Sequence, residues 1–469
     1  MSAMLRLGIV VVALLPLAAC TNEPARGPKT PSASAGTPSA DVALTGEDTR
    51  ASSGDTPATS DDAPSAGAET ASAAPKGPFW PRFHGPKGDN LSTETGLLKQ
   101  WPDGGPELVW STTGIGHGFS SVAIANRVIY TDGNVDEKTV ITAMDMDGKV
   151  LWQKENGAAW AKDHPGTRGT PTIDGDRLYH ESPLGEVVCL DAKSGERIWA
   201  RNILKEFGAE NIQWALAESV VIDGNHAICC PGGPQASVVA LDKGTGQTVW
   251  VAKGTGDKAG YATPTVAECQ GLRMVLTMNA KALVGVNAAG GDFLFRHPHE
   301  TSYDVNATSP IYHEGHIFIT SGYGSGSEML KLSVDGRKAS VEPVWASKEL
   351  DNHHGGVLLL DGYVYGSNAK GGKNNKWVCL NWETGDVAYS EPGVGKGSLT
   401  YADGMLYTFS ENRQMGLAEA TPSGHTVISR FELPSGGPGS SWAHPVVCGG
   451  RLYLRHSDRL SAYDVRAEP

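Results

Sequence analysis

Ten residues that could bind a ligand recur along the chain, each shortly before a segment with the pattern of a β-strand. They carry imidazole, guanidinium, ammonium, aromatic and amide groups: His117, Arg168, Trp214, Tyr261, Asn306, His353, His354, Lys396, Trp442 and His444. Gathered at one place, these groups suit an anionic or sugar-like ligand. His353, His354 and His444 could instead hold a metal ion, although adjacent side chains such as His353 and His354 usually point apart. Whether the ten residues meet depends on the elements that carry them.

Those elements form an internal repeat. Residues 240–250 read Ala-Leu-Asp-Lys-Gly-Thr-Gly-Gln-Thr-Val-Trp, and related copies lie at 189–199, 379–389 and, in a shorter form, 143–152. The pattern of each copy predicts a strand, a tight turn and a second strand. The Asp or Asn side chain can accept hydrogen bonds from the backbone of the turn, and Gly can adopt the positive φ that the turn needs. A further hairpin precedes each copy, as at 168–179, so each repeat supplies four strands.

Aromatic residues close the repeats and give their number. They are Trp110, Trp152, Trp199, Trp250, Phe295, Trp345, Tyr389 and Phe431. A period of about 40–50 residues with four strands each is typical of a β-propeller. Residues 108–110 lack a preceding hairpin, and residues 442–464 lack an outer strand. We therefore predict an all-β fold, an eight-bladed β-propeller of four-stranded antiparallel blades, closed by an N-terminal strand that completes the last blade.

In such a ring, the residues just before the inner strands converge on the central axis at one face. The ten residues would then line the mouth of the channel, where a ligand site is expected. Loops at 156–167 and 202–214, the second with a short helix at 202–208, could cover this mouth. The alternative is that the ten side chains bond to loop backbones and fill the funnel.

The composition agrees with this fold and excludes some partners. The 469 residues include 59 Gly and 12 Trp and are only 19% charged, as expected of an all-β chain with many tight turns. The net charge of −13 argues against nucleic acid, because binding phosphates requires clustered Lys and Arg. We expect a monomer.

The first residues have the pattern of a targeting signal. Arg6 and the apolar residues 7–17 precede Leu17-Ala18-Ala19-Cys20, which resembles the lipobox of bacterial lipoproteins, where the cysteine becomes the lipidated first residue. An ordinary secretory signal with an incidental cysteine is the alternative. The Ala, Ser, Thr and Pro-rich residues that follow contain no aromatic side chain and are expected to be disordered. The predicted divisions are a lipoprotein signal peptide at 1–19, lipidated Cys20 with a linker at 20–77, and the propeller at 78–469.

Residues 240–250 match the pattern A-x-D-x-x-T-G-x-x-x-W. With the repeat period, this motif resembles the tryptophan-docking propellers of the PQQ-like repeat superfamily, over about residues 79–466. Residues 80–86, 95–98, 352–356 and 397–401 more narrowly resemble PQQ-binding-like β-propeller repeat lipoproteins, a BamB-like group. The resemblance implies a lipid anchor in the bacterial cell envelope, in the outer membrane facing the periplasm, and an envelope protein or a small polar ligand as partner. This fold hosts enzymes and scaffolds alike, so it does not by itself imply an activity.

The vicinal pair Cys229 and Cys230 raises the question of an enzyme. Some PQQ-dependent alcohol dehydrogenases of this superfamily stack a vicinal disulfide on their cofactor. However, the Glu, Asn and Asp that bind calcium in those enzymes, and their catalytic Asp, have no match in this sequence, and no Cys-x-x-Cys-His attaches a haem. The alternative is that Cys229 and Cys230 are small apolar strand residues. We therefore predict no catalytic residue, metal or cofactor, with PQQ and calcium as the alternative.

These observations support three functional hypotheses. The first is a membrane-anchored, non-catalytic β-propeller of the bacterial cell envelope that acts as a protein-interaction or ligand-binding scaffold. The second is a PQQ-dependent periplasmic oxidoreductase acting on alcohols or sugars. The third is a sensor or carbohydrate-binding module.

Overall fold

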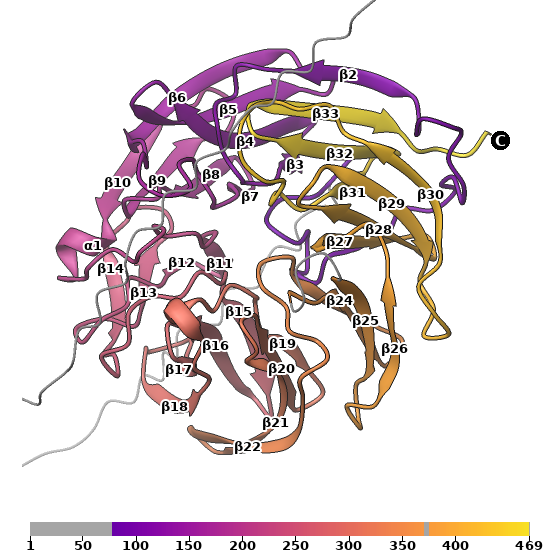
Figure 1. The fold of residues 1–469 in the computed structure, drawn as a ribbon. Coiled ribbons are helices and arrows are strands. Elements are labelled where there is room, and N and C mark those ends of the chain that lie inside the picture. Colours follow the sequence, from indigo (N-terminus) through magenta and orange to yellow (C-terminus); the bar gives the residue numbers. More distant parts are fainter. Residues whose placement is uncertain (1–76, 370–374, 469) are drawn as a thin grey trace, which may run out of the picture. The chain divides into compact units, whose positions relative to one another are not determined.

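Eight small β-sheets follow one another around a ring in the computed structural model, which describes residues 77–369 and 375–468 (Figure 1). The predicted signal peptide, Cys20 and all of the predicted linker except Gly77 lie outside the described residues. The predicted short helix is present as α1 (Ile203–Glu206), which Asn202 caps by accepting the Lys205 N–H. No helix within 77–369 and 375–468 is long and apolar enough to cross a membrane.

In seven of the blades, four antiparallel strands follow in chain order from the channel outward. The first four blades are β3 (Ala123–Ala125), β4 (Val128–Val135), β5 (Lys138–Asp145), β6 (Val150–Ala158); β7 (Thr172–Asp174), β8 (Arg177–Glu181), β9 (Glu186–Asp191), β10 (Arg197–Asn202); β11 (Val221–Asp223), β12 (His226–Cys229), β13 (Val238–Asp242), β14 (Thr248–Ala252); and β15 (Thr265–Cys269), β16 (Leu272–Asn279), β17 (Ala282–Asn287), β18 (Phe293–Pro298). The next three are β19 (Ile311–His313), β20 (His316–Ser321), β21 (Gly326–Asp335), β22 (Lys338–Ser347); β23 (Val357–Leu360), β24 (Tyr363–Ser367), β25 (Lys376–Asn381), β26 (Val387–Pro392); and β27 (Gly397–Ala402), β28 (Met405–Ser410), β29 (Gln414–Glu419), β30 (Val427–Glu432).

The eighth blade joins the two ends of the described chain. It combines β31 (Val446–Cys448), β32 (Arg451–His456) and β33 (Arg459–Asp464) with β2 (Leu108–Thr112). β2 pairs antiparallel with β33, and Trp110 lies opposite Ala462. Figure 1 shows the indigo β2 beside the yellow β33. The predicted all-β, eight-bladed propeller and its closure by an N-terminal strand are therefore confirmed.

The segment before β2 lies inside the ring, which the sequence did not indicate. The backbones of Trp80 and Ile124 exchange two hydrogen bonds of 2.7 Å, and the Pro81 carbonyl accepts the Ile173 N–H at 2.7 Å. Further along, β1 (Leu91–Ser92) pairs in parallel with the inner strand β27. Residues 80–92 therefore contact the inner strands of the first, second and seventh blades, and we call them the channel segment.

Several of the closing tryptophans bond to the next blade. The indole N–H groups of Trp110, Trp199 and Trp250 donate to the carbonyls of Met146, Lys243 and Ala288 at 2.8, 2.9 and 3.0 Å. The turn glycine of the next blade lies against each indole ring. A Cβ at Gly246 would lie 2.7 Å from the Trp199 ring, and its φ is +73°. The repeat therefore needs Gly at this position for two reasons, backbone conformation and space.

Substitution of Gly246 by Ala should separate these two reasons. We expect Gly246→Ala to lower the free energy of unfolding by about 2–4 kcal/mol, since left-handed backbone costs about 1 kcal/mol and overpacking about 1–3 kcal/mol. Gly224 is the matched control, because its φ is +57° and no atom lies within 4 Å of its Cβ position. Urea unfolding of both variants measures the difference. Equal destabilisation would show that contact with Trp199 has no role.

Candidate functional site

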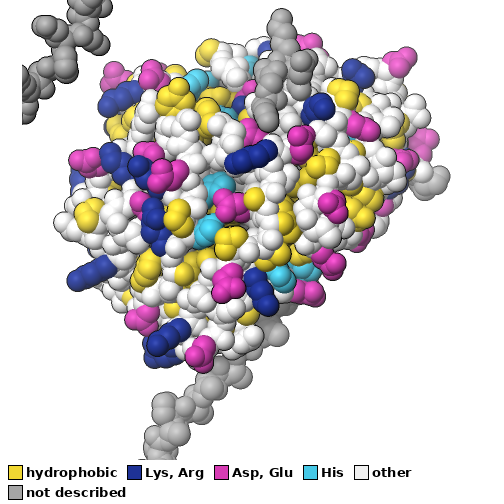
Figure 2. Space-filling view, turned by 60° about the horizontal axis from the view of Figure 1, so that its bottom comes forward, with side chains coloured by type: hydrophobic (Ala, Val, Ile, Leu, Met, Phe, Trp, Pro, Cys, Tyr) yellow, Lys and Arg dark blue, Asp and Glu magenta, His cyan; other side chains and the backbone are white. Residues whose placement is uncertain are grey.

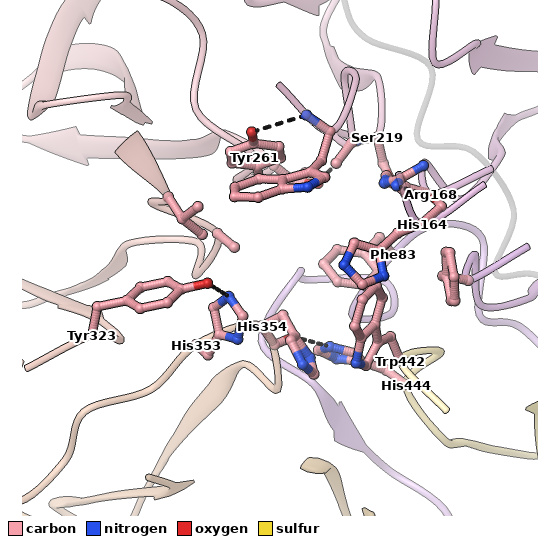
Figure 3. Close-up of a pocket in the computed structure, with 16 residues that line it drawn as sticks. Phe83, His164, Arg168, Ser219, Tyr261, Tyr323, His353, His354, Trp442 and His444 are labelled. Atoms are coloured by element: carbon pink, nitrogen blue, oxygen red, sulfur yellow. Dashed lines mark hydrogen bonds between the residues drawn. The ribbon is translucent and has the colours of Figure 1, made fainter. Parts of the chain in front are cut away.

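One cavity lies on the ring axis, which we call the axial pocket. Its volume is about 210 Å³, and seven of the ten predicted residues line it: Arg168, Trp214, Tyr261, His353, His354, Trp442 and His444. Tyr323 and His353 approach from one side and Arg168, His164 and Phe83 from the other (Figure 3). Figure 2 shows histidines next to an acidic side chain near the middle of the visible face, with charges of both signs spread around it.

The other three predicted residues lie elsewhere. Asn306 is fully buried and donates to three carbonyl oxygens, at 2.8 to 3.2 Å, so it binds loop backbone as the alternative interpretation holds. His117 contacts Ser457 Oγ through Nδ1 at 2.6 Å. Lys396 lies behind His353, with 2.9 Å between its Nζ and His353 Nδ1. None of these three lines the axial pocket.

Four aromatic or histidine side chains of the lining were not predicted from the sequence. Phe119, His164 and Tyr323 come from loops at the same face, and Phe83 comes from the channel segment. His164 belongs to the loop at 156–167 that was expected to cover the mouth. Phe83 had no signal, because nothing in the repeat places the N-terminal segment inside the ring.

The pocket walls are mainly aromatic. The Phe119 and Trp442 ring centroids are 4.6 Å apart, those of His354 and Trp442 5.1 Å, and those of Tyr323 and His353 4.9 Å. Trp214 and Tyr261 face them, with centroids 6.2 Å apart. Such flat apolar faces favour a planar ligand and limit contact with water.

Glu411 lies beside the pocket and organises three of the predicted residues. Its Oε1 accepts hydrogen bonds from His354 Nε2 at 2.7 Å, Trp442 Nε1 at 2.8 Å and Lys396 Nζ at 2.9 Å. Burial by itself would raise the pKa of Glu411, but the hydrogen bond from His354 and the charge of Lys396 hold it well below its ordinary value. A carboxylate with these three donors is a poor general base, so Glu411 fixes the geometry of the pocket wall.

The hydrogen-bond partners of His353 and His444 determine which ring nitrogen carries the proton. Lys396 Nζ can only donate, so His353 Nδ1 accepts, and its Nε2–H donates to Tyr323 Oη at 3.2 Å. His444 Nε2 lies 2.9 Å from the His354 carbonyl and must donate to it. Burial lowers the pKa of His353 to about 2, together with the nearby His354 and Lys396, and burial lowers that of His444 to about 4. A ligand would therefore meet neutral imidazoles at His353 and His444.

The predicted metal alternative can be compared with this geometry. The His353 and His354 rings lie side by side, with centroids 4.7 Å apart, which differs from the expected opposite directions. Each ring nevertheless bonds to a different partner, and His444 Nδ1 lies 3.0 Å from His84 Nε2. Within residues 77–369 and 375–468, no three His, Cys, Asp or Glu side chains are grouped to hold a metal ion.

Cys229 and Cys230 lie inside the third blade and outside the pocket lining. Both are free and buried, and they belong to different hydrophobic clusters. Burial raises the pKa of both thiols well above the ordinary value. They therefore resemble the small apolar strand residues of the alternative interpretation.

A buried carboxyl pair lies beside these cysteines. Glu181 and Glu218 are 3% and 4% exposed, and Glu218 Oε1 accepts the Cys230 N–H at 2.5 Å. Burial raises the pKa of both carboxyls, and that of Glu181 is raised further by the charge of Glu218. The folded protein therefore favours the protonated form of Glu181.

The raised pKa of Glu181 predicts that the free energy of unfolding depends on pH, and Glu181→Gln should remove this dependence. In the unfolded state Glu181 loses its proton above its ordinary pKa, about 4.5, whereas in the folded state it keeps the proton to a higher pH. The free energy of unfolding therefore decreases as pH rises from about 4.5 toward the pKa of the folded state. We expect Glu181→Gln to raise the free energy of unfolding by about 1–2 kcal/mol at pH 8 and by less at pH 5, since one pKa unit is about 1.4 kcal/mol. Urea unfolding across this range tests it, with Glu210→Gln as the control because that side chain is 81% exposed. A gain independent of pH would contradict the raised pKa of Glu181.

The quinone cofactor of related propellers can be tested against these residues. PQQ is planar and carries several carboxylates, and in dehydrogenases it binds with calcium. Among the described residues, the pocket lining offers one permanent cation, Arg168, and no carboxylate for calcium. Glu411 already accepts three hydrogen bonds, and the vicinal cysteines lie outside the lining. The residues present do not fit PQQ with calcium.

Comparison with known proteins gives matches of two kinds. The sequence model of the family described as outer membrane protein assembly factor BamB matches residues 90–236 and 137–391. The structure of BamB from Moraxella catarrhalis is similar, with 15% identity, a TM-score of 0.55, and coverage of 77% of this chain and 98% of that one. The quinohemoprotein alcohol dehydrogenase of Comamonas testosteroni has 11% identity, a TM-score of 0.61, and coverage of 84% and 81%.

One curated relative matches in sequence. The quinoprotein alcohol dehydrogenase PedH of Pseudomonas putida is 24% identical over 190 residues, which is 38% of this chain. The match spans 30% of the length of PedH. At these identities, the similarity to the solved structures demonstrates a shared fold.

Proposed function

The chain belongs to the family of the outer membrane protein assembly factor BamB, and from this premise we propose that it is a non-catalytic scaffold of the bacterial cell envelope. In this proposal Cys20 carries a lipid that holds the protein at the outer membrane, facing the periplasm. The propeller binds an envelope protein through its loops or blade edges, and a small ligand in the axial pocket.

The observation that carries the proposal is the state of the polar groups around the axial pocket. Glu411 accepts three hydrogen bonds, and His353 and His444 are each fixed by partners on both ring nitrogens. A general base requires a group that is free to take a proton from the substrate. Glu411, His353 and His444 already have partners, and the lining around them is mainly aromatic, which supports binding without chemistry.

Crosslinking in intact bacteria tests the scaffold. The full chain should be found in the outer-membrane fraction and should capture the same envelope protein in repeated experiments. Cys20→Ser should move the chain to the soluble fraction and weaken this capture, while the purified body melts at an unchanged temperature. A chain that is soluble with Cys20 intact, or that captures no envelope protein, would contradict the proposal.

The alternative function is a PQQ-dependent oxidoreductase acting on alcohols or sugars, which the similarity to alcohol dehydrogenases favours. Its test is the absorbance spectrum of the purified chain after incubation with PQQ and calcium. We expect no quinone absorbance after desalting and no dye-linked oxidation of ethanol or glucose. Retained absorbance together with oxidation would replace the scaffold by the enzyme.

A further inference from the structure

The polar groups that line the axial pocket are unusual for a sugar site. Among the described lining residues there is no Asp, Glu, Asn or Gln. A sugar presents hydroxyl groups that donate as well as accept, and carboxylate and amide oxygens are the side-chain groups best suited to receive those protons. The pocket is therefore poor in acceptors.

Its hydroxyl groups have protons left to donate. Tyr323 Oη accepts from the fixed Nε2–H of His353, so its own proton is free. Ser219 Oγ accepts the Thr170 N–H, and Thr263 Oγ1 accepts the Ser219 N–H, both at 2.9 Å. Because a hydroxyl that accepts from a backbone N–H keeps one proton for another partner, these three residues present donors to a ligand.

Arg168 adds the one permanent positive charge of the lining. Its Nη1 and Nη2 donate to the carbonyls of Gly166 and His164, both at 2.6 Å, and the guanidinium lies 5.5 Å from the Phe119 ring centroid. These contacts hold the group in place and use two of its five N–H donors. Burial lowers the pKa of Arg168 to about 10, so it remains charged at neutral pH.

The remaining lining is flat and apolar. Phe83, Phe119, Trp214 and Trp442 contribute ring faces, and the indole N–H of Trp442 is already bonded to Glu411. The cavity of about 210 Å³ is small. A ligand of one or two aromatic rings would stack on these faces, while its acceptor-rich end met the donors (Figure 3).

We infer that the axial pocket takes a small aromatic carboxylate, with the ring between the aromatic walls and the carboxylate against Arg168 and the hydroxyl of Ser219, which lies on the same side of the pocket (Figure 3). The inference deepens the proposed scaffold function, because it names the class of ligand for its pocket. One guanidinium matches one carboxylate, whereas PQQ carries several. A sugar would leave its own donors unpaired.

Calorimetric titration of the purified chain with benzoate tests the ligand class. Benzyl alcohol is the matched probe, since it keeps the ring and replaces the carboxylate by a hydroxyl, and glucose represents a sugar. We expect benzoate to bind at least tenfold more tightly than benzyl alcohol, and glucose to give no heat of binding. Equal affinity for benzoate and benzyl alcohol, or tighter binding of glucose, would overturn the inference.

Two variants test the assigned residues. Arg168→Gln should weaken benzoate binding at least tenfold, and Ser219→Ala, which removes only the hydroxyl, should weaken it about threefold to tenfold. Tyr303→Phe, which also removes one hydroxyl, is the control, because Tyr303 is 66% exposed and lies outside the lining. Should Arg168→Gln fail to fold, Ser219→Ala still decides. Unchanged benzoate affinity in a folded variant of either residue would overturn the assignment.

These results are independent of the envelope role. Failure to bind benzoate would leave membrane attachment and capture of an envelope protein unaffected. Conversely, absence of a membrane partner would leave benzoate affinity unchanged. The two proposals can therefore fail separately.

Discussion

Arg455→Met is expected to lower the free energy of unfolding by about 3–5 kcal/mol, the range found when one partner of a buried charged network is removed. Arg455 lies on β32 of the eighth blade and is 2% exposed. Its Nη1 donates to the Asp132 carbonyl at 2.6 Å and to Thr131 Oγ1 at 2.8 Å, and its Nη2 donates to the Gly116 carbonyl at 2.9 Å. All three acceptors belong to the first blade or the loop before it. Methionine would fill the space but remove all three of these buried hydrogen bonds.

Urea unfolding monitored by circular dichroism measures this loss. Arg455→Lys keeps the charge but lacks the planar set of five donors, so it should recover less than half of the lost stability. Arg459→Met is the control, since its hydrogen bonds to Ser435 and Ser111 are exposed. We expect Arg459→Met to change stability by less than about 1 kcal/mol. An equal loss of stability in Arg455→Met and Arg459→Met would show that the buried hydrogen bonds of Arg455 add no more stability than exposed ones.

The repeated part of this fold could be predicted from sequence because the same signal recurs in every blade. The turn before Trp250 reappears before Trp199 and Tyr389, so several weak indications of a hairpin support one another. The closure by β2 followed from an incomplete first unit and an incomplete last unit. Arg455 had no such signal, because its contacts with the first blade occur once and join residues more than 300 positions apart.

Some residues of the candidate site were predicted correctly and others were not, again because only the repeated positions carry a signal in the sequence. The rule that residues before inner strands reach the axis placed Trp442 and His353 correctly, but Asn306 turns to the backbone, where its amide has three acceptors. Glu411 could have been found. β27 and β28 form a hairpin in which Gly397 lies opposite Ser410, so the flanking Lys396 and Glu411 must be neighbours. The position of Phe83 could not be found, because the channel segment lies outside the repeat.

Trp110→Ala tests the ring closure itself, and we expect it to lower the free energy of unfolding by about 3 kcal/mol. The indole N–H of Trp110 bonds to the Met146 carbonyl of the first blade, and its ring covers Gly148, whose Cβ position lies 2.6 Å from it. β2 has five residues and is the only strand of the eighth blade that comes from the N-terminal side. No short turn connects β2 to β33. Without the contacts of Trp110, β2 can therefore detach locally from β33, and the ring then opens at the eighth blade.

Trp199→Ala is the matched comparison, because Trp199 makes the equivalent bond to Lys243 and covers Gly246 in the same way. Its strand β10 remains connected to β9 by a tight turn, so it cannot leave the sheet easily. Both variants should lose similar global stability. Native-state hydrogen exchange should distinguish them, since only Trp110→Ala should lose protection of the amides in β2 and β33 at low denaturant. Equal protection of these two strands in both variants would mean that closure of the ring does not depend on Trp110. The channel segment and the hydrogen bonds of Arg455 would then hold the first and last blades together without it.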